Sequence, residues 1–184
     1  ALTLCIIAGG FDLSTASIFG VASCAAAWIA VNIDPLLGLA LAPVIGIILG
    51  YVNGVLITSL GVHSFLATIA TSLIYRGIAI LITGGFLIPV RMPEFIWLGR
   101  GKIYGIHYTI FILIMFTVIM TIILNRTTFG RNVFAVGGNE EASKLAGIRA
   151  NLVTIYTFAL TGLAAGIAGA IQVSRISLGQ PQAG

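Results

Sequence analysis

Few side chains in this sequence could do chemistry inside a membrane, and each lies in or beside a long apolar run. Asp12 follows a glycine pair, Asn53 lies among small residues, and Arg76 lies well inside the run from Ser64 to Thr83. An ionisable group deep in a bilayer is costly, so it normally faces the protein interior or a water-filled path. An amide offers both donors and an acceptor to a hydroxyl group. These residue types suit the passage of a polar solute better than covalent catalysis.

Each of these residues also has a structural interpretation. For Asp12 we favour a cap on a helix that begins near Ser14; the alternative is a broken membrane helix that presents its end to a cavity. Arg76 lies about 18 Å along its segment at 1.5 Å per residue, near the middle of the membrane. A structural role, in which Arg76 holds neighbouring backbone or helices, and a role in the solute pathway stay equally open. Asn53 and Gln172 could bind a solute hydroxyl, but hydrogen bonds between helices are favoured for both.

The other reactive residue types indicate no catalytic or metal site. His63 and His107 stand alone near segment ends, without a second ligand at metal spacing. Cys5 and Cys24 lie in apolar runs, where a free cysteine behaves as a small hydrophobe. The GxxxxGK(S/T) loop that holds nucleotide phosphates is missing, and Lys and Arg are dispersed rather than gathered in a stripe. We predict no enzyme, metal, cofactor or nucleic acid site.

The composition predicts that these residues are positioned by membrane helices. Hydrophobic residues make up 59% of the chain and charged residues only 8%, and crossing a bilayer takes about 20 mostly apolar residues. No run alternates with a period of two. We therefore predict a single all-α domain over 1–184, a polytopic membrane helix bundle. Its expected membrane segments are approximately 1–8, 16–33, 36–60, 64–83, 108–124 and 152–174.

Small residues recur every four positions in two of these segments. Gly46, Gly50 and Gly54 form one such face, and Gly162 and Gly166 form the other. In lipid, faces of small residues let helix backbones approach closely. We favour packing within one subunit over a dimer interface.

A polar stretch, 125–150, separates the last two apolar runs. It contains Arg126, Arg131, Lys144 and Arg149, four of the nine basic residues. Short loops rich in Lys and Arg stay in the cytoplasm, so we place this stretch inside and 84–107 outside. The outer stretch itself holds three basic residues, so this charge rule supports the orientation only weakly. Within the outer stretch, 92–98 is expected to form a short interfacial helix.

A short helix is expected inside this polar stretch. A turn at 137–139 leads to Asn139, a good N-cap. Glu140 and Glu141 suit the first turn, Glu140 can pair with Lys144, and Gly147 can end the helix. The helix is too short to be stable alone. Its apolar face, Ala142, Leu145 and Ala146, packs either on the chain itself or on a docking protein.

Sequence motifs favour the docking interpretation. Glu141-Ala142-Ser143 followed by Gly147 resembles the Glu-Ala-Ala, three residues, Gly signature of ABC importer permeases, with Ser143 in place of the second Ala. Gly9 to Ser14, GGFDLS, resembles the GGIDLS segment of ribose-type sugar permeases within that superfamily. Further agreement in order and spacing comes from SFLAT at 64–68, IYRG at 74–77, NRT at 125–127, FGR at 129–131 and GGNEEA at 137–142. The resemblance covers essentially the whole chain.

This resemblance implies the permease subunit of an ATP-driven sugar importer in a bacterial plasma (inner) membrane, with the chain as a middle piece. The implied partners are a cytosolic ABC ATPase, an extracytoplasmic sugar-binding protein, a second permease copy and membrane lipid. The ATPase-coupling residues would be Asn139, Glu140, Glu141, Ala142, Leu145 and Gly147. ATP would be hydrolysed by the separate ATPase.

Two other functions are compatible with a polytopic bundle. An ion-coupled secondary transporter of a small polar solute needs an ionisable group at mid-depth, and Asp12 is the only acidic residue that could be so placed. A membrane scaffold without transport fits the composition but explains none of the shared motifs. We rank the importer first and the scaffold last.

Overall fold

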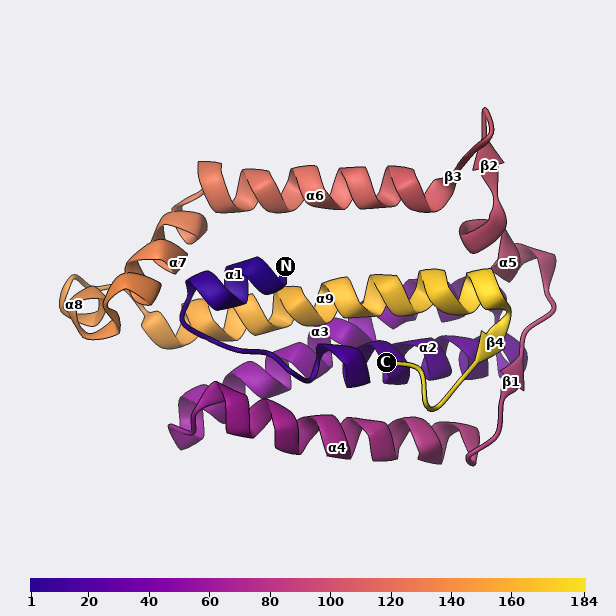
Figure 1. Cartoon of the computed structure of the whole chain (residues 1–184), viewed down its shortest axis with the longest axis horizontal. Coiled ribbons are helices and arrows are strands. Elements are labelled where there is room, and N and C mark those ends of the chain that lie inside the picture. Colours follow the sequence, from indigo (N-terminus) through magenta and orange to yellow (C-terminus); the bar gives the residue numbers. More distant parts are fainter.

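Five long helices form the body of the computed structural model, which describes residues 1–184 (Figure 1). Each is long and apolar enough to cross a membrane. They agree within two residues with five of the predicted segments, and the prediction of an all-α polytopic bundle is confirmed. These helices are α2 (Thr15–Asn32), α3 (Pro35–Leu60), α4 (Ser64–Thr83), α6 (Tyr108–Arg126) and α9 (Ala150–Ile176).

Short elements gather at the two ends of the bundle (Figure 1). One end holds α7 (Thr128–Gly138) and α8 (Glu140–Leu145), and α1 (Leu2–Ile7) points toward it. The other end holds α5 (Pro93–Arg100) and the strands. There β1 (Ile88–Pro89) pairs antiparallel with β4 (Leu178–Gly179), and β2 (Lys102–Ile103) with β3 (Ile106–His107). The polar stretch 125–150 and the stretch 84–107 therefore lie at opposite ends, as alternation of the segments predicted.

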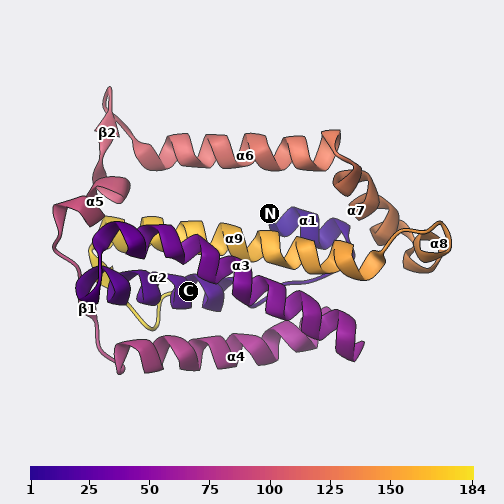
Figure 2. The same cartoon turned by 180° about the vertical axis from the view of Figure 1, so that it is seen from behind.

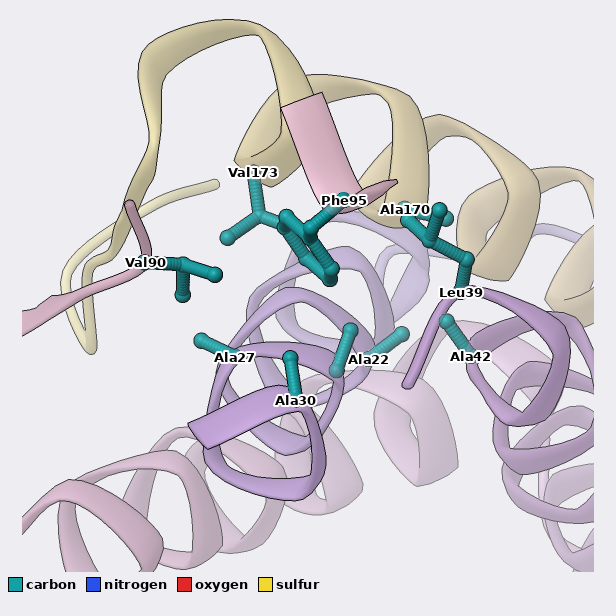
Figure 3. Close-up of a cluster of buried hydrophobic side chains, with 10 residues drawn as sticks. Ala22, Ala27, Ala30, Leu39, Ala42, Val90, Phe95, Ala170 and Val173 are labelled. Carbon is teal, nitrogen blue, oxygen red and sulfur yellow. The ribbon is translucent and has the colours of Figure 1, made fainter. Parts of the chain in front are cut away.

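Helix α2 lies in the centre of the bundle, between α3, α4 and α9. Its alanines are small enough to let these neighbours approach, and Ala22, Ala26 and Ala30 are buried in the largest apolar cluster. Figure 3 shows this cluster, in which Phe95 of α5 points toward α2 from the strand end. The cluster also contains Ala27, Leu39, Ala42, Val90, Ala170 and Val173.

The two glycine faces pack on each other. A Cβ atom placed on Gly50 would lie 2.3 Å from the Phe158 carbonyl oxygen, and one on Gly46 would lie 2.2 Å from that of Gly162. On the opposite helix, a Cβ on Gly166 would lie 2.5 Å from the Ala42 carbonyl oxygen. Only glycine permits backbones this close, and α3 and α9 make the most extensive helix–helix contact of the subunit.

Local signals in the sequence start and end these helices. The Asp34 carboxylate accepts from the amides of Leu36 and Leu37 and caps α3, and Pro35 occupies the first helical position. Gly61 ends α3 with a φ of 63°, a left-handed conformation that glycine adopts without strain. His63 accepts from the amide of Phe65 at the start of α4.

Helix α6 stands apart from the other long helices (Figures 1 and 2). None of its residues is buried. A largely apolar cavity of about 510 Å³ separates it from α9, and Gln172 lines that cavity. None of Asp12, Asn53 and Arg76 lines this cavity with Gln172.

One local expectation is overturned and another is met. The predicted turn at 137–139 is wrong, because Gly137 and Gly138 end helix α7 and only Asn139 leaves it. The reason is packing: Gly137 presses on the Ile7 carbonyl of α1, where no side chain would fit. The helix predicted over 92–98 forms at Pro93–Arg100. It is anchored on α9, since the Ser174 hydroxyl accepts from the Gly99 amide and donates to the Phe95 carbonyl.

Candidate functional site

The chain is not helical between α1 and α2, at a depth where helices surround it. Helix α2 lies beside only the half of α9 next to the strands, and residues 8–14 run along the other half (Figure 1). Side chains alternate along this segment: Phe11 and Leu13 are exposed, whereas Asp12 and Ser14 are buried. The segment is thus an extended connection between α1 and α2.

Hydroxyl groups of α4 satisfy the backbone of this connection. The Phe11 amide donates to the Ser64 hydroxyl at 3.0 Å, and the Leu13 amide donates to the Thr68 hydroxyl at 3.2 Å. The Thr68 hydroxyl in turn donates to the Ser64 carbonyl at 2.8 Å. Non-helical backbone at membrane depth is tolerated only with such partners. The GGFDLS and SFLAT stretches, more than fifty residues apart in sequence, are therefore one structural unit.

The Asp12 carboxylate anchors the connection to the bundle. Its Oδ1 accepts from the Ser14 amide at 2.9 Å and from the Ser14 hydroxyl at 2.6 Å. Its Oδ2 accepts from the Thr161 hydroxyl of α9 at 2.7 Å. Asp12 thereby ties the start of α2 to α9.

The hydrogen bonds continue from Ser14 to two more helices. The Asn53 amide of α3 donates to the Ser14 hydroxyl at 2.6 Å. The Tyr75 hydroxyl of α4 lies 2.8 Å from Asn53 Oδ1 and 2.9 Å from the Leu49 carbonyl oxygen. We call Asp12, Ser14, Asn53, Tyr75 and Thr161 the buried polar network, since all five are buried. It joins the connection to α3, α4 and α9.

The structure separates the candidate pathway residues that the sequence grouped. Asp12 and Asn53 share the buried polar network, and Asn53 bonds between helices. Ser14, and not Asp12, occupies the N-cap position of α2. The Asp12 carboxylate accepts from the amide of Ser14 itself, before the first residue of the helix. Arg76 is exposed, and its guanidinium donates to the Gly184 carbonyl at 2.8 Å. It takes no part in the network.

Sequence reasoning missed two members of the network. Tyr75 stands beside Arg76 in the IYRG stretch, and only Arg76 carries a charge that marks it as costly in a bilayer. Thr161 lies one residue before Gly162 in an apolar run, and hydroxyl residues there commonly bond to their own helix. No signal in the sequence distinguishes Thr161 from Thr157.

A second candidate site is the short helix α8, at the end of the bundle opposite the strands (Figure 1). The Asn139 side chain caps it by accepting from the Ala142 amide at 2.9 Å. Gly147, with a φ of 83°, closes it, and the amides of Gly147 and Ile148 bond to the carbonyls of Lys144 and Ser143. Glu140 and Lys144 form an ion pair at 2.6 Å on its exposed side. The caps and the pair are those that the sequence predicted.

The apolar face of α8 is uncovered. Leu145 is 90% exposed, and Ala142 and Ala146 are also exposed. Ser143 is the one buried residue of the helix, and its hydroxyl donates to the Asn139 carbonyl. Helix α8 therefore presents its apolar side chains away from the rest of the chain.

A polar cavity lies between α8 and the connection. It has a volume of about 380 Å³, and its lining includes Glu140 and Lys144 of α8, Gly9 and Gly10, and Ser64. Helix α8 and the start of the connection therefore line the same cavity, at one end of the bundle.

Comparison with known proteins agrees with this architecture. Residues 1–184 match the family described as branched-chain amino acid transport system / permease component. The chain belongs to this permease family. With five helices able to cross a membrane, it is a multi-pass membrane protein. No solved structure matches the chain.

Curated relatives in the family are named for sugars. The L-arabinose transport system permease protein AraH of Escherichia coli (strain K12) is 37% identical over 98% of this chain and 55% of its own length. The ribose import permease protein RbsC is 37% identical in Bacillus subtilis and 34% identical in Escherichia coli, over 100% of this chain and 58% and 59% of those proteins. The chain thus spans a little over half the length of these relatives. The resemblance drawn from the motifs is confirmed.

Proposed function

We propose that this chain belongs to the permease subunit of an ATP-driven importer for a monosaccharide. Membership of the permease family supports transport, and the arabinose and ribose permeases among the relatives support a sugar as the substrate class. An extracytoplasmic binding protein would deliver the sugar, and a second permease copy would complete the translocation path. The protein would lie in a bacterial inner membrane, surrounded by lipid on the apolar outer faces of its helices.

The exposed face of α8 is the observation that carries this proposal. A six-residue helix is too short to persist in water without help, yet this one is capped at both ends and presents Leu145 almost fully exposed. The chain itself leaves this face uncovered. A cytosolic ABC ATPase that buries Leu145 and contacts Glu141 would turn the helix into a coupling element. The end of the bundle that carries α8 would then be cytosolic, with Arg126, Arg131, Lys144 and Arg149.

Contacts from α8 lead into the membrane region. Helix α7 directly precedes α8, and Gly137 of α7 rests on the carbonyl of Ile7 at the end of α1. Helix α1 leads into the connection, which the buried polar network holds against three helices. A push on α8 when two ATPase subunits close would therefore act first on the connection, residues 8–14. ATP would be hydrolysed in the ATPase, and the permease would supply the path.

Recovery of the ATPase tests the coupling role. The complete tagged permease is expressed with its ATPase in its native membrane, and ATPase recovery is compared for wild type, Leu145→Asp and Glu141→Lys. Tyr104→Asp is the matched control, because Tyr104 is fully exposed at the opposite end of the bundle. We expect both α8 variants to insert normally but lose the ATPase, and Tyr104→Asp to retain it. Equal recovery from all four proteins would refute the assignment of α8.

Sugar uptake into proteoliposomes tests the energy source. The complete permease, its ATPase and its binding protein are expected to import a pentose only with ATP inside the vesicles. Uptake driven by a proton or sodium gradient without ATP would instead favour the ion-coupled transporter.

A further inference from the structure

Residues 180–184 return from β4 to the middle of the bundle, and we call them the returning segment (Figure 1). They lie between α2 and α4. A Cβ atom on Gly20 of α2 would lie 2.6 Å from the Ala183 carbonyl oxygen, and the Arg76 guanidinium of α4 donates to the Gly184 carbonyl. Arg76 itself lies near the middle of α4. The returning segment is therefore a second stretch of non-helical chain at membrane depth.

The main chain of the returning segment has few hydrogen-bond partners in the protein. It makes one internal bond, from the Ala183 amide to the Gln180 carbonyl at 3.1 Å, and accepts one from Arg76 at 2.8 Å. The groups without a partner are the amides of Gln180, Gln182 and Gly184 and the carbonyls of Pro181, Gln182 and Ala183. The connection differs, because hydroxyls of α4 accept from its amides. Non-helical backbone at membrane depth is either bonded within the protein or lines water, and the returning segment fits the second case.

Arg76 carries a charge that no acidic side chain balances. The only ion pair of the structure joins Glu140 and Lys144, and the Asp12 carboxylate is bonded within the buried polar network. Arg76 is nevertheless exposed. A charge at this depth is costly against lipid and normally faces protein or a water-filled path. The side of α4 that carries Arg76 therefore does not face lipid.

We propose that the returning segment and Arg76 line the path of the sugar across the membrane, an inference that rests on the proposed function. A sugar hydroxyl both donates and accepts hydrogen bonds. This surface offers both kinds of group: the unpartnered amides and the guanidinium donate, the unpartnered carbonyls accept, and the exposed Gln182 side chain does either. Many transporters bind their solute beside interrupted helices near the middle of the bilayer. A passing sugar, or the water around it, would fill these bonds in turn.

A helix packed on this surface would not supply the same bonds. The amides and carbonyls of a membrane helix are already bonded to one another, and lipid tails offer no hydrogen-bonding group. Water or a polar solute is therefore the occupant that satisfies both the charge of Arg76 and the main chain of the returning segment. No acidic side chain is exposed at this depth, since Asp12 is buried. The surface thus suits an uncharged sugar better than a cation.

Thiol labelling of the complete permease in its native membrane tests whether water reaches this surface. Gln182→Cys and Ile74→Cys are made in a background without native cysteines and treated with a water-soluble, membrane-impermeant maleimide. Ile74 is the control because it is 59% exposed and, two residues before Arg76, lies on the other side of α4 at a similar depth. We expect Gln182→Cys to be labelled and Ile74→Cys to stay unlabelled. Labelling of Gln182→Cys no greater than that of Ile74→Cys would overturn the proposal.

Sugar uptake into proteoliposomes that contain the ATPase, the binding protein and ATP tests the path itself. Maleimide treatment should abolish uptake by Gln182→Cys and spare uptake by Ile74→Cys. Arg76→Leu should lose most of the uptake and Arg76→Lys, which keeps a charged donor, should lose less, while both recover the ATPase as wild type does. Wild-type uptake by labelled Gln182→Cys or by Arg76→Leu would refute the path. Failure of the proposed function is a separate result, since the untreated wild type would then import no sugar at all.

Discussion

Replacement of Gly50 by alanine should separate α3 from α9. The added Cβ would lie 2.3 Å from the Phe158 carbonyl oxygen, where ordinary contact begins at 3.4 Å. The obstacle is backbone, so no side chain can turn away and one helix must move by roughly 1 Å. A gap of about 0.5–1 Å forfeits a quarter to a half of each van der Waals contact across it. Overpacking of this kind costs about 1–3 kcal/mol.

Alanine also has a favourable effect that must be subtracted. In a helix interior it is better than glycine by about 1 kcal/mol, since glycine loses more backbone entropy on folding. Gly77→Ala in α4 measures this gain alone, because a Cβ there meets nothing within 4 Å. The two variants make the same chemical change and differ only in what surrounds the new methyl group.

Thermal unfolding of the complete permease in one detergent is the assay. We expect Gly50→Ala to melt below wild type and Gly77→Ala to melt at or above it. If Gly50→Ala melts as high as Gly77→Ala, the close approach of α3 and α9 does not limit stability. The argument from the two glycine faces would then be refuted.

Three further predictions concern the connection, the buried polar network and α8. Asn53→Ala removes the two hydrogen bonds that the Asn53 side chain makes with the Ser14 and Tyr75 hydroxyls, so we expect a loss of about 1–3 kcal/mol in denaturant unfolding at about 0.5–1.5 kcal/mol for each bond. The loss should be smaller for Tyr75→Phe, which removes one hydroxyl. Thr68→Val removes the acceptor of the Leu13 amide, so hydrogen exchange should accelerate in a peptide covering 9–14; Thr117→Val is the control, and equal exchange in both would contradict the role of Thr68. Asn139→Ala should destabilise α8 by about 1 kcal/mol through loss of its cap and lower ATPase recovery, whereas Lys144→Met, which breaks an exposed ion pair, should change recovery little.

The membrane segments could be predicted because their signals are local. A run of about 20 apolar residues must be helical in lipid, since no water is available to bond the backbone. Asp34, Gly61, Asn139 and Gly147 act on helix ends within a few residues of themselves, so their effects are also readable from sequence. The glycine faces were visible as a four-residue period. The sequence did not show which helices these faces join, because residue spacing describes one helix and not its neighbour.

The turn predicted at 137–139 shows where local reasoning ends. Adjacent glycines favour a turn in isolation, but here Gly137 makes room for the carbonyl of Ile7, a residue far away in sequence. Arg76 shows the same limit. Its depth was estimated from position along a helix, whereas its environment depends on the direction in which the helix faces and on the C-terminal residues that reach it.

The sequence alone determined a helical membrane protein, the ends of its helices, the short capped helix α8 and, through its motifs, the permease family. The tertiary structure decided that GGFDLS and SFLAT form one unit, that Asp12 is bonded to Thr161, and that Tyr75 rather than Arg76 joins Asn53. The physical reason is the distance along the chain over which each interaction acts. Hydropathy and capping act within a turn or two of helix, but a buried hydrogen bond requires two groups to be brought within about 3 Å. Only the packing of α2 against α3, α4 and α9 brings residues 12 and 161 together.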